Sequence, residues 1–352
     1  MTVTDLLHIR LHNQLLACHS KKSSKEIVSH LGIVQAQNFD MAKWAIGVRL
    51  NNATVCNIED ALNTGEILRT HILRPTWHFV AAEDIHEFRE LSSARLLPIY
   101  EAYGKSWGAD EKLIAQGSRR MEKLLEKHGH LTKQEIGEHL ANDGFELDQH
   151  TLSHVLSRSE LLGITCSGIV GVNKHTYALL EERVPKTKPF IKEEALGRLA
   201  FKFFNSHGPA TIHDFSWWSG LLTSEAKSAL ELVKEHFVSE TLNDKTFWMK
   251  NDVTIPEKDR ESVLLLPPFD EFVVSYKDRS EIIEKEYHSK VMTKNGIFSS
   301  TIMLNGKIIG SWRKVKKKND IHVELSFFEK TSQNREQKFE KEIERVKRFY
   351  DR

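Results

Sequence analysis

Residues 131–180 carry a pattern of apolar and polar positions that predicts two helices followed by two short strands. Thr132 and Glu135 form a capping box at the first helix, and a turn at 142–144 ends it. Asp148 precedes a second helix, which Gly163 ends. ITCSG and TYALL then supply the strands. This order is typical of a winged helix, and we expect its second helix to present His150, His154 and Arg158 outward.

The same order of elements returns twice. At 191–250, helical patterns through ALGRLAFKFFNSHG, ATIHDFSWWSGL and SEAKSALELVKEHF precede a hairpin around Asn243 and Asp244. At 1–80, Ser23 and Glu26 form a capping box, and ILRTHILRPTWHFV alternates like a hairpin interrupted at Pro75. Such units bind DNA in many proteins, but they also serve as scaffolds or protein-binding modules.

The pattern changes to strands after residue 255. SVLLLPPFDEFVVSY is apolar and β-rich, with an interruption at Pro267 and Pro268, and GIFSSTIMLNGKIIGSWRKV contains two alternating strands joined by Asn305 and Gly306. IHVELSFF adds a strand, and an amphipathic helix closes the chain. We therefore predict an α+β fold. It has tandem winged helix-turn-helix units at 1–105, 106–190 and 191–254, followed at 255–352 by a small β-barrel-like domain with a C-terminal helix.

Composition excludes several classes of protein. The 352 residues are 40% hydrophobic and 28% charged, which is typical of soluble globular chains of more than one domain. The N-terminal MTVTDLLHIRLHNQ lacks the charge and hydropathy pattern of a signal peptide, and no stretch is apolar enough for a membrane span. The three cysteines form no zinc-binding pattern. We expect a cytoplasmic, nucleoid-associated monomer that uses neither metal nor cofactor.

The overall charge of the chain is uninformative about its partners, but one local run of basic residues is a candidate for binding. The total is +1, so binding to nucleic acid cannot be inferred from overall charge. A basic run does occur, and we expect it to lie beside the hairpin turn at Asn305 and Gly306. Its members are Arg313, Lys314, Lys316, Lys317 and Lys318. Such a run is either a solvated face or a contact to DNA phosphates.

Six segments, in order along nearly the whole chain, resemble the AlkZ-like winged-helix DNA glycosylases. They are VQAQ at 34–37, LRPTWHFV at 73–80, SELLGITCSG at 159–168, SHGPATIHDFSWWSGL at 206–221, LPPFDEFVVSYKDR at 266–279 and LNGKIIGSWR at 304–313. The resemblance implies excision of alkylated bases from double-stranded DNA and, in the founding member, unhooking of interstrand crosslinks. It also implies a catalytic Gln-x-Gln motif, which falls on Gln35 and Gln37; a related branch has Gln-x-Asp instead.

The chemistry of glutamine constrains how such a pair could act. Side chains two positions apart share a face only in an extended segment, so the chain must leave its helix near Val34 for Gln35 and Gln37 to converge. At a helix end, the same amides would simply meet water. Glutamine is a poor base, but a cationic alkylated purine leaves without protonation, so the amides need only orient a water molecule. No lysine lies beside the pair to form a Schiff base, which predicts monofunctional hydrolysis without strand cleavage.

Several other residues are candidates for a functional or a structural role. Arg74, Thr76, Trp77 and His78 are candidates for contact with DNA. Asp270 and Glu271 either supply a carboxylate near the sugar or fix the β domain, and Asp40 is expected to cap the following helix. Trp217 and Trp218 fit a core better than a base-stacking role. The alternative to an enzyme is a non-catalytic DNA-binding regulator, which would not need two converging amides.

Overall fold

Side-chain caps start several of the helices that the hydrophobic pattern predicts. In the computed structural model, which describes residues 1–106, 110–171, 174–186, 188–251, 262–317, 320–330 and 337–351, the capping boxes at Ser23 and Thr132 are both formed. Asp148 also caps its helix, accepting from the backbone N–H groups of His150 and Thr151. The prediction for Asp40 is wrong, because Asn38 is the N-cap and Asp40 lies in the first turn. Asparagine is as good an N-cap as aspartate.

The chain divides into two compact units, Met1–Ile58 with Gly197–Arg352, and Glu59–Leu196. The first unit contains α1 (Val3–Asn13), α2 (Ser24–Leu31), β1 (Ile33–Gln35), α3 (Phe39–Gly47), the start of α4 (Val55–Asn63), most of α10 (Lys192–His207), α11 (Ile212–Ser219), α12 (Thr223–Glu231), η1 (Lys234–His236), β7 (Phe237–Leu242), β8 (Lys245–Lys250), β9 (Val263–Leu266), α13 (Glu271–Val274), η2 (Lys285–Tyr287), α14 (His288–Val291), β10 (Thr301–Leu304), β11 (Lys307–Lys317), β12 (Asp320–Phe327) and α16 (Glu340–Tyr350). The division into four segments stays a prediction.

The second unit holds the helices and strands of the clearest predicted copy. It contains β2 (Ile67–His71), β3 (Trp77–Ala81), α5 (Ala82–Ser106), α6 (Glu111–His128), β4 (Leu131–Thr132), α7 (Lys133–Asn142), α8 (Gln149–Leu161), β5 (Thr165–Ser167), β6 (Thr176–Leu179) and α9 (Leu180–Arg183). β2 and β3 form the predicted antiparallel hairpin, and β4, β6 and β5 form a small sheet in that order. A core of Ile, Leu, Met and Val side chains fills the space between α6, α7 and α8.

The orientation predicted for α8 is only partly right. His150 is exposed, but His154 and Arg158 are 4% and 8% exposed. The Arg158 guanidinium is paired with Glu111 of α6. The helix therefore directs Arg158 toward its neighbour instead of toward solvent.

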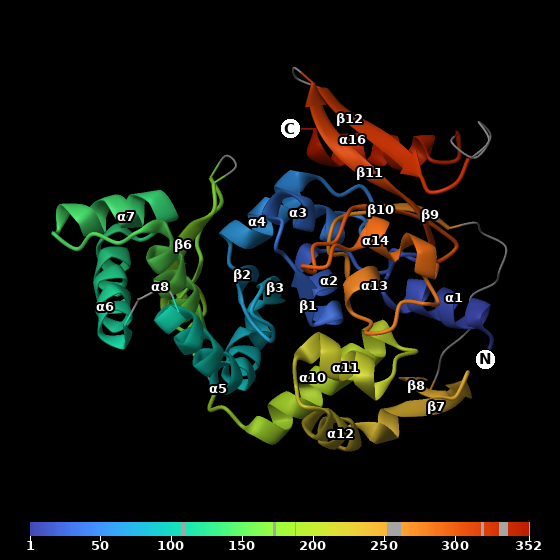
Figure 1. The fold of residues 1–352 in the computed structure, drawn as a ribbon, viewed down its shortest axis with the longest axis horizontal. Helices are drawn as coiled ribbons and strands as arrows, with labels where there is room; N and C mark the ends of the chain where they lie inside the picture. Colours follow the sequence, from blue (N-terminus) through green and yellow to red (C-terminus); the bar gives the residue numbers. More distant parts are fainter. Residues whose placement is uncertain are drawn as a thin grey trace. The chain divides into compact units, whose positions relative to one another are not determined.

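The β region of the first unit is an open antiparallel sheet in the order β12-β11-β10-β9, with α16 lying against β12 (Figure 1). The described strands do not close into a barrel. Two buried tryptophans fix β9, because Trp44 Nε1 donates to the carbonyl of Leu265 and Trp312 Nε1 donates to the carbonyl of Leu266, both at 2.7 Å. The same strand is thereby tied to both α3 and β11.

The segment after β9 differs from its prediction. The apolar run FVVSY was expected to continue as a strand, but Glu271–Val274 form the short helix α13. The chain turns at Phe269, whose φ is 61°, and Asp270 caps the helix by accepting from the backbone N–H of Phe272. Short apolar runs have no periodicity that separates strands from buried helices.

Two glycines allow the close packing near β1. Gly32 ends α2 with a φ of 82°, which favours glycine, and turns the chain into β1. At Gly47, a Cβ atom would lie 2.4 Å from the ring of Phe349, so only glycine lets α16 pack this closely on α3.

A half-buried histidine makes the first unit sensitive to acid. Burial lowers the pKa of His30 to about 4, and its Nε2 lies 2.7 Å from the carbonyl of Asn13. Since the unfolded chain binds this proton near pH 6.5 and the folded chain does not, stability falls as the pH drops below about 6.5. We expect a loss of about 2 kcal/mol from this residue between pH 8 and pH 5.

Urea unfolding of the wild type and His30→Gln at the two pH values measures this effect. Glutamine keeps a donor for the Asn13 carbonyl but does not titrate. The variant should lose about 2 kcal/mol less than the wild type on acidification. Equal pH dependence of the two proteins would refute the assignment to His30.

Candidate functional site

Gln35 lies at the end of β1, where the chain has already left the preceding helix. α2 ends at Leu31, so the departure from helix required by the sequence argument is observed. Gln35 is 6% exposed, whereas Gln37 is exposed and lies between β1 and the cap residue Asn38. The backbone therefore has the extended form at Gln35 that convergence of the two amides would need.

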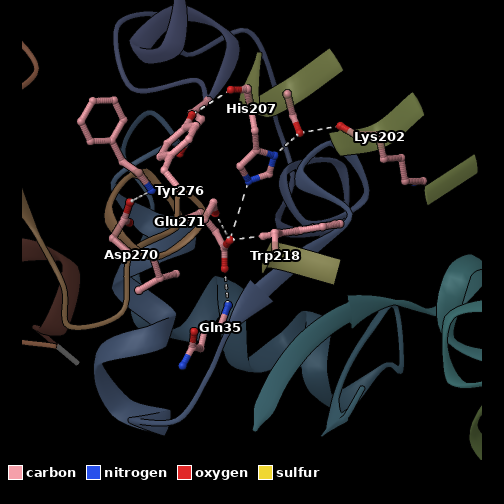
Figure 2. Close-up of polar contacts among 12 residues, drawn as sticks. Gln35, Lys202, His207, Trp218, Asp270, Glu271 and Tyr276 are labelled. Carbon is pink, nitrogen blue, oxygen red and sulfur yellow. Dashed lines mark hydrogen bonds and ion pairs between the residues drawn. The ribbon is translucent and has the colours of Figure 1, made fainter. Parts of the chain in front are cut away.

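The backbone of Gln35 is held by a buried carboxylate from a segment far away in the sequence. Its N–H donates to Glu271 Oε1 at 2.7 Å, across 236 residues. Figure 2 shows the backbone nitrogen of Gln35 facing Glu271, with the side-chain amide directed away from that carboxylate. The contact fixes the main chain and leaves the amide outside the polar cluster.

The other oxygen of Glu271 receives two side-chain donors. Trp218 Nε1 donates to Oε2 at 3.0 Å, and Ser275 Oγ donates to the same atom at 2.6 Å. Glu271 and Trp218 are both 0% exposed, so Trp218 belongs to the core, while Trp217 is 44% exposed. A buried carboxylate is stable only when donors satisfy it, as here.

His207 also lies beside Glu271 in this cluster (Figure 2). Ser206 Oγ donates to the carbonyl of Lys202, so the hydroxyl oxygen is left to accept from His207 Nδ1 at 2.8 Å. His207 Nε2 is 3.7 Å from Glu271 Oε2, too far for a hydrogen bond. Complete burial lowers the pKa of His207 although Glu271 opposes the shift, so the ring is neutral near pH 7.

Asp270 binds a different partner from its neighbour. Both of its oxygens accept from Arg49, at 2.7 and 2.9 Å, and both side chains are 0% exposed. Asp270 therefore ties α13 to the end of α3, as one of its two sequence readings proposed. Sequence reasoning did not find the Gln35–Glu271 contact, because no local pattern signals a pairing over this separation.

The four candidates in LRPTWHFV lie in and beside the β2–β3 hairpin. Arg74 Nη2 is 3.2 Å from His78 Nε2, and His78 Nδ1 donates to the carbonyl of Thr76 at 3.0 Å. His78 is fully buried, and Trp77 packs under the guanidinium of Arg69, 3.9 Å from its ring centre. The structure thus gives Trp77 and His78 packing contacts, and contact of all four with DNA stays a prediction.

A buried polar cluster beside this hairpin was also missed. Glu160 is 0% exposed and accepts from the backbone N–H of His71 at 3.1 Å and from its ring Nδ1 at 2.5 Å. Burial raises the pKa of Glu160, and it lowers the pKa of nearby Arg69 to about 10. Glu160 stands in a sequence of apolar residues, SELLGI, which was the available signal.

The basic run does not lie at the hairpin turn, which corrects the expected placement. Asn305 and Gly306 join β10 to β11, whereas the described members of the run follow further along the 11-residue strand β11, at positions 313, 314, 316 and 317. The turn itself packs on α1, since a Cβ at Gly306 would lie 2.9 Å from Leu7. Gly306 is therefore buried against α1, while Asn305 beside it is exposed.

The members of the run have different surroundings. Arg313 is 80% exposed and pairs with Glu324 across the strands at 2.8 Å, and Lys316 is exposed. Lys314 is bound to Asp40 and lies 3.4 Å from the centre of the Tyr350 ring, and burial lowers its pKa. Lys318 lies outside the described residues. The described part of the chain contains no cluster of three or more His, Cys, Asp or Glu side chains suited to a metal ion.

Comparison with known proteins decides the family. The profile of the family described as DNA glycosylase AlkZ-like matches residues 28–349. The chain belongs to the AlkZ-like DNA glycosylase family. The predicted DNA glycosylase is thereby confirmed, against the reading as a non-catalytic regulator.

A curated sequence and a solved structure from Streptomyces sahachiroi are similar to this AlkZ-like chain. An interstrand DNA cross-link repair glycosylase is 20% identical over 319 residues, which cover 86% of this chain and 85% of the relative. The solved structure of DNA glycosylase AlkZ superposes with a TM-score of 0.79 at 18% identity, over 99% of this chain and 96% of the other. The mixed helical and sheet fold is therefore shared from end to end. Across the ranges that the structure describes, no helix has the length and apolarity to cross a membrane.

Proposed function

We propose that this chain hydrolyses the N-glycosidic bond of alkylated, cationic purines in double-stranded DNA, with Gln35 and Gln37 positioning the attacking water. The observation that carries the proposal is the hydrogen bond from the Gln35 backbone to Glu271, which fixes an extended segment with its amide directed away from the carboxylate. A fixed amide can hold water at a defined point, and such positioning lowers the entropic part of a barrier.

The charge of this site supports a cationic substrate. Glu271 places a buried negative charge behind Gln35, which would favour the positive charge that develops on the sugar as the base leaves. Neither glutamine can protonate a leaving base. An ordinary purine would therefore stay bonded to its sugar. An alkylated purine, which is already positively charged, would be released.

The relative that repairs interstrand cross-links extends the proposed substrates. A crosslink through purine nitrogens carries the same positive charge, so its hydrolysis needs the same site. We propose that crosslinks are unhooked here, and that the enzyme works as a cytoplasmic monomer without metal or cofactor.

We also propose that the order α6, β4, α7, α8, β5 and β6 forms a winged helix that contributes to DNA binding, with a related arrangement in α10, α11, α12, β7 and β8. The three-stranded order β4-β6-β5 supports this interpretation. The β2–β3 hairpin is proposed to contact DNA through Arg74 and Thr76, with Trp77 and His78 beside them.

Replacing either glutamine by alanine should lower base excision by at least about tenfold, or 1.4 kcal/mol of barrier. The affinity for DNA should be largely kept, because the amides are proposed to hold water and not phosphate. Duplexes with N7-methylguanine, N3-methyladenine or a nitrogen-mustard crosslink serve as substrates, and abasic sites are the readout. Wild-type excision by the double variant would exclude a catalytic role for the pair.

The basic run is proposed to contact phosphates, and salt dependence tests it. Changing Lys316, Lys317 and Lys318 to alanine should make the log–log salt slope of DNA binding shallower by roughly two to three units, at about 0.9 per contact. The change should be the same for damaged and undamaged duplexes, because phosphate contacts do not read sequence. Lys227→Ala, at an exposed position of α12, is the control. An unchanged salt slope in the triple variant would indicate that the run is a solvated strand end that does not contact DNA.

A further inference from the structure

The ring of His207 has one nitrogen that is hydrogen-bonded and one that is not. Ser206 Oγ donates its only proton to the carbonyl of Lys202 at 2.6 Å, so toward His207 Nδ1, at 2.8 Å, it can only accept. A neutral imidazole has a single N–H, which is therefore on Nδ1. Nε2 then carries a lone pair, and it is buried without a hydrogen-bond partner among the described residues.

This lone pair faces a carboxylate oxygen. His207 Nε2 lies 3.7 Å from Glu271 Oε2, and both side chains are fully buried. An ionised carboxylate only accepts hydrogen bonds, and Oε2 already accepts from Trp218 and Ser275. Two acceptors that face each other repel, whereas a proton between them would form a strong hydrogen bond. The pair is therefore a buried site for one proton.

The surroundings of His207 hold its ring in place, so Glu271 is the partner that would move. The ring stacks on Phe203, with centroids 5.0 Å apart and planes 10° apart, and the carbonyl of His207 accepts from Tyr276 Oη at 2.8 Å. A charge-assisted hydrogen bond is about 2.7–2.9 Å long, so a bound proton would draw Glu271 toward His207 by roughly 1 Å. Figure 2 shows His207 and Gln35 on opposite sides of the Glu271 carboxylate. The movement therefore leads away from Gln35.

The charged groups around His207 decide the pH range in which this proton binds. Burial has the largest effect and lowers the pKa of His207, and Arg49 at the end of α3 acts in the same direction. A positive charge on His30 of α2 would also repel one on His207. Glu271 opposes these effects, and Tyr276 stays neutral because burial raises its pKa to about 12. The proton therefore binds only below the ordinary histidine range, at a pH under about 6.5.

We propose that His207 is a positioning residue for the Gln35 segment. Its neutral ring leaves Glu271 on the backbone N–H of Gln35, and one proton bound between His207 Nε2 and Glu271 Oε2 withdraws that anchor. Whichever atom carries the proton, the carboxylate shares its negative charge with it and holds the N–H of Gln35 less tightly. The consequence for base excision rests on the proposed role of Gln35: excision should be full above the midpoint of this titration and lost as the pH falls through it.

Nuclear magnetic resonance of the Gln35 amide tests the proton-binding pair without reference to catalysis. Valine labelled with 13C at the carbonyl and glutamine labelled with 15N isolate this signal, because Val34-Gln35 is the one place in the chain where glutamine follows valine. In the wild type the signal should move along a one-proton titration curve with a midpoint below about pH 6.5. His207→Asn keeps a donor for Ser206 Oγ but has no atom at the place of Nε2, so the movement should vanish. His30→Gln is the control: it removes another histidine whose pKa burial lowers, and the movement should remain.

Ser206→Ala decides the question if His207→Asn does not fold, as judged by circular dichroism. Without an acceptor at Nδ1, the neutral ring of His207 should carry its proton on Nε2, where Glu271 accepts it. The Gln35 signal of this variant should therefore be displaced toward the acid position of the wild type already at about pH 8.

Three results would overturn the inference. They are a Gln35 signal that stays fixed in the folded wild type down to about pH 4.5, one that moves equally in folded His207→Asn, and one that is not displaced in folded Ser206→Ala.

Single-turnover excision over the same pH range separates this inference from the proposed function. Excision by the wild type should fall about tenfold for each pH unit below the midpoint of the Gln35 signal, and excision by folded His207→Asn should show no such decline. Constant excision while the wild-type signal moves would contradict the proposed role of Gln35 in catalysis, and the proton-binding pair would stand.

Discussion

Glu271→Gln is expected to lower base excision by about 100-fold, the typical cost of misplacing a catalytic group by roughly 1 Å. Both oxygens of Glu271 accept hydrogen bonds, Oε1 from the Gln35 backbone and Oε2 from Trp218 and Ser275. An amide has one oxygen and one NH2 group. In either orientation, the NH2 of the new side chain faces an N–H donor, that of Gln35 or that of Trp218. Either β1 loses its anchor, or the side chain that anchors it must shift away from Trp218.

Single-turnover excision and DNA affinity, measured separately, distinguish this positioning role from a general loss of folding. Affinity for an undamaged duplex should be kept. Glu160→Gln is a matched control, because Glu160 is also fully buried and also accepts from a backbone N–H, that of His71. A similar loss of excision in both variants, or none in Glu271→Gln, would argue against the anchoring of Gln35 by Glu271.

Local features of this fold could be predicted from the sequence because their causes are local. The capping boxes at Ser23 and Thr132 need only residues three positions apart, and the turn at Asn305 and Gly306 needs only its own two residues. The helix after Pro268 was missed, because its start depends on the positive φ of Phe269 and the cap at Asp270. Neither feature produces a periodic pattern.

The candidate site was predictable in part. Gln35 and Gln37 were found through the resemblance to a family. Their spacing made an extended backbone a condition for convergence, and β1 has that form up to Gln35. The role of Glu271 was left open, since its contact with Gln35 spans 236 residues. The expectation that Arg158 faces outward was wrong for a similar reason, because its partner Glu111 belongs to another helix. Pairings between distant segments depend on packing, which no local spacing encodes.

The largest expected change in stability belongs to Asp270, whose replacement by asparagine should cost about 3–5 kcal/mol of unfolding free energy. The carboxylate accepts from two nitrogens of Arg49 and from the backbone N–H of Phe272, and it is 0% exposed. Asparagine has nearly the same shape but no charge. The guanidinium would then stay buried without an anion, and its desolvation would no longer be offset.

Urea unfolding of a set of variants separates this buried pair from ordinary surface charge. The double variant Arg49→Met with Asp270→Asn should recover part of the loss, because it removes the buried charge together with its partner. Arg313→Ala is the control, since Arg313 is 80% exposed in its pair with Glu324 and such pairs contribute at most about 1 kcal/mol. A cost below about 1 kcal/mol for Asp270→Asn would mean that water or a shifted backbone replaces the carboxylate. Asp270 also caps α13, and α13 carries Glu271, which holds the backbone of Gln35. A large loss of unfolding free energy in Asp270→Asn would therefore link the stability of this unit to the position of Gln35.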